Sequence, residues 1–364
     1  MGFNCGIVGL PNVGKSTLFN ALTQTAAAQA ANYTFCTIEP NIGRVAVPDP
    51  RLDMLTQIGK SQKTVPTSLE FVDIAGLVRG ASKGECLGNQ FLANIREVDA
   101  IVHVLRCFED GDITHVEGSV DPIRDAETVE TELMLADLDG LEKRAYNLSK
   151  RAKGGDKEAI AQMALIEPML VALQAGKPAS TAVPKGEEVA ASKQQLMTTK
   201  PVLYVCNVGE SEAATGNAHS ARVVARAEAE GARAVIVSAA IEAEISQMAG
   251  DDRAAFLADL GLEDSGLDRI IRAGYGLLGL VTYFTCGPKE ARAWTIVKGT
   301  KGPGAAGVIH GDFERGFIAA ETISYEDYVV YRGEQGAKEA GRMKVEGKEY
   351  VVKDGDVMLF RFNV

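Results

Sequence analysis

One segment near the N-terminus constrains the fold of this 364-residue chain more than any other. Its sequence is Gly9-Leu10-Pro11-Asn12-Val13-Gly14-Lys15-Ser16, which has the form GxxxxGK[ST]. In this pattern, the backbone N–H groups of a glycine-rich loop surround phosphate oxygens. A short apolar run, Asn4 to Val8, precedes the loop, and a segment of helical composition, Ser16 to Leu22, follows it. A strand, a glycine-rich loop and a helix in this order predict a phosphate-binding P-loop.

The chemistry of a bound triphosphate gives individual residues of this loop separate roles. Gly14 lets the backbone turn so that N–H groups point at phosphate oxygens. Lys15 reaches the β- and γ-phosphates, which also makes it a candidate catalytic residue, and the Ser16 hydroxyl binds Mg²⁺. The helix that begins near Lys15 adds the positive end of its dipole. We therefore expect nucleotide contacts from Asn12, Val13, Gly14, Lys15, Ser16 and Thr17.

A second motif, Asp73-Ile74-Ala75-Gly76, follows the apolar run Leu69 to Val72. A carboxylate at a strand end can hold the metal, and the Gly76 N–H can donate to the γ-phosphate during catalysis. Between the two motifs, a nucleotide switch needs a threonine whose hydroxyl completes the Mg²⁺ shell. Thr37 is the best candidate, with Thr34 as the rival and an ordinary loop threonine as the third interpretation. The predicted metal ligands are Ser16, Thr37 and Asp73.

The water-activating residue is not obvious from the motifs. Many GTPases have a glutamine directly after Asp-x-x-Gly that orients the attacking water, whereas this chain has Leu77. Hydrolysis should therefore be slow unless another group is supplied. His115 lies in a polar loop after the predicted strand Ala100 to Cys107, and a neutral imidazole can accept a hydrogen bond from water. The alternative is an ordinary loop histidine, and His103, within the strand, is expected in the core.

A third segment concerns the base. Guanine-specific P-loop proteins usually carry Asn-Lys-x-Asp after a late strand, but Asn207-Val208-Gly209-Glu210 follows the predicted strand Pro201 to Cys206 here. Asn207 can hydrogen-bond the adenine edge, Val208 can pack on the ring, and Ser238-Ala239 follows the next strand, where a backbone N–H would meet the base. The residues alone indicate weakened guanine selectivity. The alternative is that Glu210, one methylene longer than Asp, still reaches guanine.

The rest of the chain predicts an α/β fold with two additions. Strands alternate with helices, which predicts a mainly parallel sheet with helices on both faces. Apolar residues then recur at spacings of three and four on both sides of Gly154-Gly155, which predicts a helical hairpin with the basic run Lys143 to Lys157 at its tip. Beyond Leu280 we expect a small mixed domain with strands at 281–284, 293–297, 350–352 and 357–362. The predicted domains are 1–127 with 200–277, then 128–199 and 278–364.

Composition limits the possible partners and compartments. The chain has 38 Lys+Arg and 49 Asp+Glu, a net charge of -11, which argues against a surface that coats nucleic acid but leaves room for local basic patches. The six cysteines form no CxxC pair, so they are expected as free thiols in a reducing compartment. No uncharged run is apolar enough to span a bilayer. We expect a cytoplasmic protein without membrane contact.

Taken together, these motifs resemble the YchF/Obg-like ATPase family, which belongs to the translation-factor class of P-loop NTPases. The resemblance covers essentially the whole chain. It also includes Asn-Tyr-Thr-Phe-Cys-Thr-Ile-Glu-Pro-Asn from Asn32, Gly-Ala-Ser-Lys-Gly-Glu from Gly80, and Arg-Ala-Gly-Tyr-Gly-Leu-Leu from Arg272. The segment 331–338 resembles the tail of that family. One departure is Thr34, where the family usually has proline, which loosens the loop that carries Thr37.

The resemblance implies a function. Family members hydrolyse ATP, need Mg²⁺ and associate with ribosomes, and their C-terminal module is a β-grasp TGS domain. We therefore expect an Mg²⁺-dependent ATPase that binds the large ribosomal subunit, and RNA, through the TGS domain and the basic arm, and whose nucleotide state regulates translation or stress-related partners. Some related NTPases bind a monovalent cation through an asparagine at the position of Asn12, so K⁺ is a further candidate. The alternatives are a GTP-specific Obg-type assembly GTPase and an adaptor with a mainly structural nucleotide site.

Overall fold

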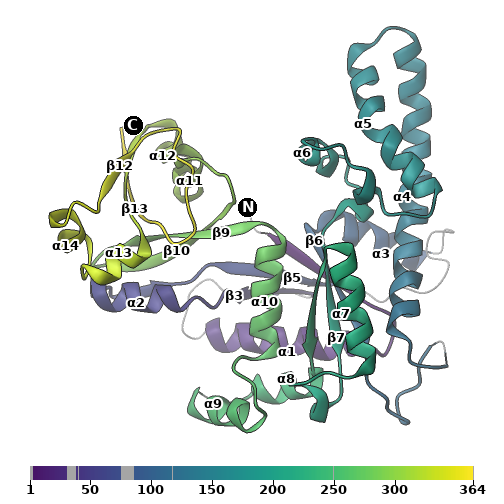
Figure 1. Ribbon diagram of the computed structural model, residues 1–364, viewed down its shortest axis with the longest axis horizontal. Coiled ribbons are helices and arrows are strands. Elements are labelled where there is room, and N and C mark those ends of the chain that lie inside the picture. The colour runs from purple at the N-terminus through teal and green to yellow at the C-terminus, as the bar shows by residue number, and fades with distance from the viewer. Residues whose placement is uncertain are drawn as a thin grey trace.

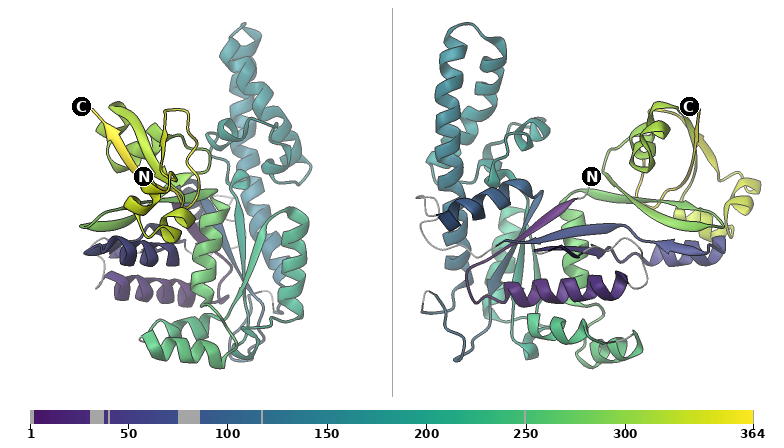
Figure 2. Two further views of the ribbon diagram at one scale, coloured as in Figure 1. Left: turned by 60° about the vertical axis from the view of Figure 1, so that its left-hand side comes forward. Right: turned by 180° about the vertical axis from the view of Figure 1, so that it is seen from behind.

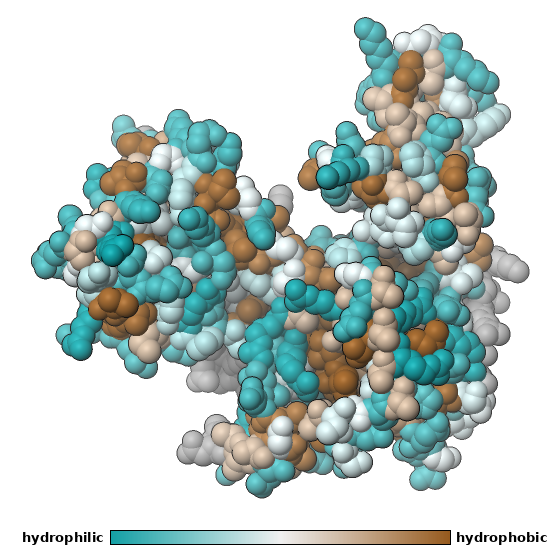
Figure 3. Space-filling view, viewed as in Figure 1, coloured by the Kyte–Doolittle hydropathy of each residue, from teal (hydrophilic) through white to brown (hydrophobic). Residues whose placement is uncertain are grey.

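The computed structural model describes residues 3–30, 38–39, 41–74, 86–116, 118–248 and 250–363. Three parts are visible in Figure 1: a central domain around a twisted sheet, a helical arm, and a C-terminal domain around a second sheet. The arm and the C-terminal domain leave the central domain at separate places, as the two further views in Figure 2 also show. The space-filling view shows an open hollow between them (Figure 3).

The central sheet has seven strands. Their order is β2 (Ile38–Glu39), β3 (Ile42–Ala46), β5 (Ser68–Asp73), β1 (Asn4–Val8), β6 (Ala100–Arg106), β7 (Val202–Asn207) and β8 (Arg233–Val237). The strands from β5 to β8 pair in parallel, and β2 and β3 are antiparallel. The expected α/β class with a mainly parallel sheet is therefore confirmed.

Helices cover both faces of this sheet. Along β7, Leu203 and Val205 point into the main core, whereas Tyr204 and Cys206 point into a second cluster of buried residues. This alternation is the period of two that a strand buried on both faces requires. The covering helices are α1 (Lys15–Ala30), α3 (Cys86–Glu97), α7 (Ala218–Glu230), α8 (Ala239–Ile245) and α10 (Gly266–Leu277), followed by the short α9 (Gly250–Asp259) in the loop between α8 and α10. His103 is buried in β6, as predicted, and burial lowers its pKa to about 3.

Two long helices form the arm. α4 (Pro122–Lys153) and α5 (Lys157–Gln174) run antiparallel, and the turn between them contains Gly155 at φ 85°. The 32 residues of α4 span about 48 Å. Its first turns belong to the central core through Val129 and Leu133, so one continuous helix connects the central domain to the arm tip. The expected helical hairpin is present.

The returning chain is attached to α4 through a buried carboxylate. After α5 come η2 (Ala179–Ala182), α6 (Glu188–Ser192) and η3 (Met197–Thr199). Asp137 in the middle of α4 accepts hydrogen bonds from the Met197 N–H at 3.1 Å, the Thr198 N–H at 2.8 Å and the Thr198 hydroxyl at 2.7 Å. These hydrogen bonds hold the returning chain against α4 at the base of the arm.

The C-terminal domain is built on a six-stranded sheet in the order β12-β11-β13-β9-β10-β4. Its own strands are β9 (Leu280–Cys286), β10 (Glu290–Val297), β11 (Phe317–Ile323), β12 (Lys344–Glu346) and β13 (Val357–Phe362). The helices are α11 (Gly302–Ile309), α12 (Gly311–Arg315), α13 (Tyr325–Val330) and α14 (Glu334–Glu339). β11 and α11 are not among the elements predicted from the sequence.

The strand expected at 350–352 is wrong. Only an isolated bridge between Lys301 and Val351 forms there. Val352 is buried and Tyr350 packs against the same cluster around Tyr283 and Phe360. Apolar residues in a short run report burial, and a loop that covers a core satisfies the same pattern as a strand.

An edge strand of this second sheet comes from the first part of the chain. β4 (Lys63–Val65) pairs in parallel with β10, and α2 (Pro50–Gly59) packs Leu52 and Leu55 into the core of the C-terminal domain. Residues 50–65 therefore pack with the C-terminal sheet, although the sequence predicts them in the nucleotide-binding domain. No helix among the described residues is long and apolar enough to cross a membrane.

Candidate nucleotide-binding site

The predicted P-loop connects β1 to α1, and both of its motif glycines are sterically required. Gly14 has φ 91°, a backbone conformation that favours glycine. A Cβ atom there would lie 2.1 Å from Asn207 Nδ2. A Cβ atom on Gly9 would lie 2.7 Å from the Val104 carbonyl oxygen. The loop is therefore packed closely against β6 and the end of β7.

A cavity of about 1140 Å³ lies over this loop, at the carboxyl ends of the parallel strands. This is the edge at which open α/β sheets bind ligands. Several loops contribute lining residues. They are Leu10, Pro11, Asn12, Gly14, Lys15, Ser16 and Thr17 from the P-loop, Asp73, then Phe108, Glu109, Asp110 and Ile113, then Asn207 to Ser211, and Ser238 to Ala240.

The phosphate end of the cavity contains the expected charged residues. Lys15 forms an ion pair with Asp73, and both side chains are largely buried. Ser16 is exposed beside them and lines the same cavity. A hydroxyl and a carboxylate are the hard oxygen donors that Mg²⁺ prefers, and Mg²⁺ usually takes only one or two protein carboxylates together with phosphate oxygens. Ser16 and Asp73 therefore fit a magnesium ion bound with a triphosphate.

Asn207 connects the P-loop to the loop after β8. Its Nδ2 donates to the Val13 carbonyl at 2.9 Å, and its Oδ1 accepts from the Ala239 N–H at 2.9 Å. Asn207 is 4 % exposed. These bonds use one N–H and one lone pair of the Asn207 amide. The contact of Asn207 with the adenine edge stays a prediction, and it would use the second N–H of Nδ2 and the second lone pair of Oδ1.

The other residues predicted to contact the base line the same cavity. Val208 is 2 % exposed and donates its N–H to the Val237 carbonyl at 2.8 Å. Glu210 begins a short 3-10 helix, η4 (Glu210–Glu212), and Ser238 is the residue before α8. The structure therefore brings Val208, Glu210, Ser238 and Ala239 together around one end of the cavity.

Two residues that the sequence analysis did not identify shape this end of the cavity. Glu212 Oε2 accepts from the Gly209 N–H at 3.3 Å and from Asn217 Nδ2 at 2.8 Å. Asn217 Nδ2 also donates to the Cys107 carbonyl at 2.6 Å. The signal available in the sequence was the position of Asn217 directly before α7, since asparagine is a preferred N-cap residue.

A buried arginine organises the loop that follows β6. Arg106 is 1 % exposed and donates to the carbonyls of Phe108 at 3.2 Å, Asp110 at 3.2 Å and Ile113 at 2.9 Å. Its guanidinium also lies 4.6 Å from the centre of the Phe108 ring. In the sequence, Arg106 lies within the predicted strand Ala100 to Cys107, and its partners are carbonyl groups that no sequence pattern reveals.

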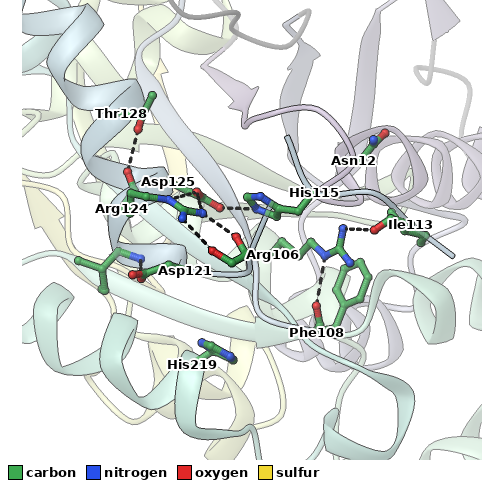
Figure 4. A network of polar contacts seen from close by, with 12 residues as sticks. Asn12, Arg106, Phe108, Ile113, His115, Asp121, Arg124, Asp125, Thr128 and His219 are labelled. Carbon is green, nitrogen blue, oxygen red and sulfur yellow. Dashed lines mark hydrogen bonds and ion pairs between the residues drawn. The ribbon is translucent and has the colours of Figure 1, made fainter. Parts of the chain in front are cut away.

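His115 lies in this same loop but does not line the cavity (Figure 4). It is 8 % exposed, and its Nε2 lies 2.8 Å from Asp125 Oδ2. The preceding carbonyl, that of Thr114, accepts from Asn12 Nδ2 at 3.1 Å, so the loop contacts the P-loop directly. His115 is therefore a buried, carboxylate-paired histidine beside the site, and its predicted role toward water stays a prediction.

Four residues that the sequence considers for roles in metal binding or water activation lie outside the described residues. These are Thr34 and Thr37, the two candidates for the switch threonine, and Gly76 and Leu77 in and after the Asp-x-x-Gly motif. The geometry of this site therefore rests on Lys15, Ser16 and Asp73.

The fold and this cavity define a P-loop nucleoside triphosphatase. A family model described as "50S ribosome-binding GTPase" matches residues 4–133, and the model YchF-GTPase_C, described as "Protein of unknown function (DUF933)", matches residues 280–363. Proteins of similar sequence indicate the family within this class. Proteins named ribosome-binding ATPase YchF are 58 % identical in Haemophilus influenzae, 57 % in Escherichia coli O157:H7 and 55 % in Bacillus subtilis, each with 100 % of both chains covered.

A solved structure agrees with these relatives. The structure of the Schizosaccharomyces pombe YchF GTPase is 38 % identical, with a TM-score of 0.89, and the match covers 99 % of this chain and 98 % of that one. The chain belongs to the YchF family.

Proposed function

We propose that this chain is an Mg²⁺-dependent ATPase that binds ribosomes and whose nucleotide state controls that association. The observation that carries the proposal is the meeting of Lys15, Ser16 and Asp73 in one cavity beside the P-loop. The names of the bacterial relatives support ATP and the ribosome as partners. The test is phosphate release from ATP with and without ribosomes. Equal, negligible release in both would favour an adaptor with a structural nucleotide site.

Metal binding in this proposal uses hard oxygen ligands. Ser16 and Asp73 would hold Mg²⁺, with Thr37 as the proposed third protein ligand. K⁺ is the proposed second cation, through Asn12. Because Asn12 Nδ2 donates to the Thr114 carbonyl, the amide Oδ1 is the atom that would contact the cation. Turnover measured in K⁺ and in Na⁺ at equal ionic strength tests this, and an Asn12→Ala variant should lose any difference.

Catalysis requires charge stabilisation and a positioned water. Lys15 stabilises the charge that develops on the β- and γ-phosphates, and the Gly76 N–H donates to the γ-phosphate. His115 accepts a hydrogen bond from the attacking water, which is a role that Leu77 cannot fill. His115→Ala should lower turnover by about 10² or more and leave ATP affinity nearly unchanged.

ATP is the proposed substrate because the bacterial relatives are named ATPases, and because Val208, where guanine-specific proteins have lysine, weakens guanine selectivity. A second candidate is GTP. Two observations favour it: Glu210 lines the cavity, and the relative from Schizosaccharomyces pombe is named a GTPase. Titration with ATP and GTP side by side decides between them. A GTP affinity about tenfold above that for ATP, or roughly 1.4 kcal/mol, would refute the ATP assignment.

Ribosome binding is assigned to the basic arm tip and the C-terminal domain, which we propose is a TGS module of β-grasp type. Near the tip, the Lys150 ammonium lies 4.0 Å from the centre of the Tyr146 ring, and Tyr146 is 63 % exposed. Cations beside an exposed aromatic ring suit RNA, whose phosphates and bases they can both contact. The proposed docking site is the large subunit, and the proposed location is the cytoplasm.

A further inference from the structure

The structure pairs His115 with a carboxylate that belongs to the arm helix. His115 Nε2 and Asp125 Oδ2 lie 2.8 Å apart, and the two side chains are 5 % and 1 % exposed. Asp125 is in the first turn of α4. Figure 4 shows the two side chains facing each other between the loop after β6 and the start of this helix.

The surroundings of Asp125 determine which ring nitrogen carries the proton. Its other oxygen, Oδ1, accepts from Arg124 Nη2 at 3.1 Å and Nε at 3.3 Å. Asp125 therefore has a guanidinium on one carboxylate oxygen and the imidazole on the other. An ionised carboxylate only accepts hydrogen bonds, so the short contact requires a hydrogen on His115 Nε2. In the neutral ring, Nδ1 then carries the lone pair.

The loop backbone around His115 is fixed relative to the phosphate site. The Thr114 carbonyl accepts from Asn12 Nδ2 of the P-loop, and the Ile113 carbonyl accepts from the buried Arg106. Ile113 itself lines the nucleotide cavity. His115 is therefore two residues from the cavity wall, between a backbone contact to the P-loop and a side-chain contact to α4.

We propose that Asp125 is a positioning residue for ATP hydrolysis, which acts through His115. By accepting from Nε2–H, Asp125 selects the tautomer whose Nδ1 is a hydrogen-bond acceptor and limits rotation of the ring. That tautomer is the one that can orient an attacking water. Asp125 does not itself contact the nucleotide, and no proton needs to move to it. The inference rests on the proposed role of His115.

The main experiment compares Asp125→Asn with His115→Ala and with the double variant. An amide can present its N–H in place of its oxygen and so stabilise the other histidine tautomer, as occurs when the aspartate of a Ser-His-Asp triad is replaced by asparagine. We expect kcat for ATP to fall at least tenfold in Asp125→Asn with KM nearly unchanged. The double variant should be no slower than His115→Ala, because Asp125 acts only through His115. Asp125→Glu, which keeps a carboxylate, should restore part of the turnover.

A matched control separates this effect from a change of charge or helix stability. Asp121 is the N-cap residue of α4, four positions before Asp125, and asparagine caps helices about as well as aspartate. Asp121→Asn removes the same charge and should keep wild-type turnover. The tautomer can also be measured in the wild-type chain by ¹⁵N NMR of its four histidines, with His115 assigned from the spectrum of His115→Ala. We expect the proton on Nε2.

The outcomes distinguish the proposed role of His115 from that of Asp125. Wild-type turnover in His115→Ala would remove the proposed role of His115 and this inference with it. Slow turnover in His115→Ala, with wild-type turnover in Asp125→Asn or with losses that multiply in the double variant, would overturn the role of Asp125 alone. A proton on Nδ1 in the NMR spectrum would overturn it as well, even if the Asp125 variants fail to fold.

Discussion

Asn207→Ala tests whether Asn207 builds the nucleotide site or recognises the base. The substitution removes an amide whose Nδ2 donates to Val13 and whose Oδ1 accepts from Ala239. Both partners are backbone groups of residues at most 3 % exposed, and they belong to the P-loop and to the start of α8. The variant therefore disconnects the P-loop from the start of α8.

The free-energy cost of Asn207→Ala follows from the two backbone groups that lose their hydrogen-bond partner, the Val13 carbonyl and the Ala239 N–H. A buried backbone group left without a hydrogen bond costs about 1–3 kcal/mol. Two such groups give about 2–6 kcal/mol, and relaxation of the loops or entry of water favours the lower end. A truncated side chain of this size also leaves space next to Gly14, whose Cα lies against Asn207. We expect an affinity loss of at least about tenfold, equivalent to roughly 1.4 kcal/mol.

The assay is calorimetric titration of ATP and GTP, each with Mg²⁺, into wild type and variant. Because Asn207 orders the loops that receive any nucleotide, both affinities should fall by a similar factor. Thermal unfolding measured on the same samples shows how much of the loss reflects global stability. Asn207→Asp keeps an acceptor for the Ala239 N–H but sets a second, negatively charged oxygen against the Val13 carbonyl, so affinity for both nucleotides should fall at least as far as in Asn207→Ala.

A change in base preference would refute this reasoning. If Asn207→Ala lost ATP affinity and kept GTP affinity, Asn207 would be a base-reading residue, as the sequence alone suggests. Unchanged affinity for both nucleotides would show that the connection to Val13 and Ala239 contributes nothing to binding.

Three further predictions concern the phosphate site, the arm tip and the base of the arm. Lys15→Ala should abolish ATP hydrolysis in a phosphate-release assay, and wild-type turnover would contradict the P-loop assignment. Changing Lys150, Arg151 and Lys153 to Glu should weaken co-sedimentation with ribosomes in a salt-dependent way. The same reversal at exposed Lys177, Lys185 and Lys193 controls for net charge, and equal binding of both variants would exclude the tip. Asp137→Ala, which leaves the Met197 and Thr198 N–H groups without their acceptor, should lower the free energy of unfolding by about 2–5 kcal/mol, as measured by denaturant titration.

The phosphate site could be predicted from the sequence because its residues are contiguous or follow strands directly. The strand Asn4–Val8 has the predicted bounds, and α1 begins at the Lys15 that the motif places at its start. Asp73 is the last residue of β5. A carboxylate that directly follows an apolar run can therefore be placed at the edge of a parallel sheet from the sequence alone. Local patterns of this kind determine where a backbone goes, and the side chains at strand ends follow.

Contacts between distant segments could not be predicted in this way. Asn207 donates to a carbonyl 194 positions away, and Arg106 is satisfied by carbonyls, which every residue carries. The sequence places His115 in a polar loop, but nothing local indicates that the carboxylate of Asp125, ten positions later, pairs with its ring. Only the three-dimensional structure shows which of the many carboxylates in the chain pairs with His115.

The same reason explains why the sequence pattern does not show that residues 50–65 pack with the C-terminal sheet. Residues 47–67 connect β3 to β5, and both of these strands belong to the nucleotide-binding sheet. Within this connection, Arg51 pairs with Asp354 at 2.7 Å and lies over the Phe284 ring, while β4 extends the C-terminal sheet beyond β10. A β-strand at a sheet edge needs a partner with free backbone groups, and that partner arrives more than 200 residues later in the chain. The strand that ends at Asp73 is thus attached through its preceding loop to the C-terminal domain. Because Asp73 lines the phosphate end of the cavity, β5 and this loop connect that end of the cavity to the second sheet.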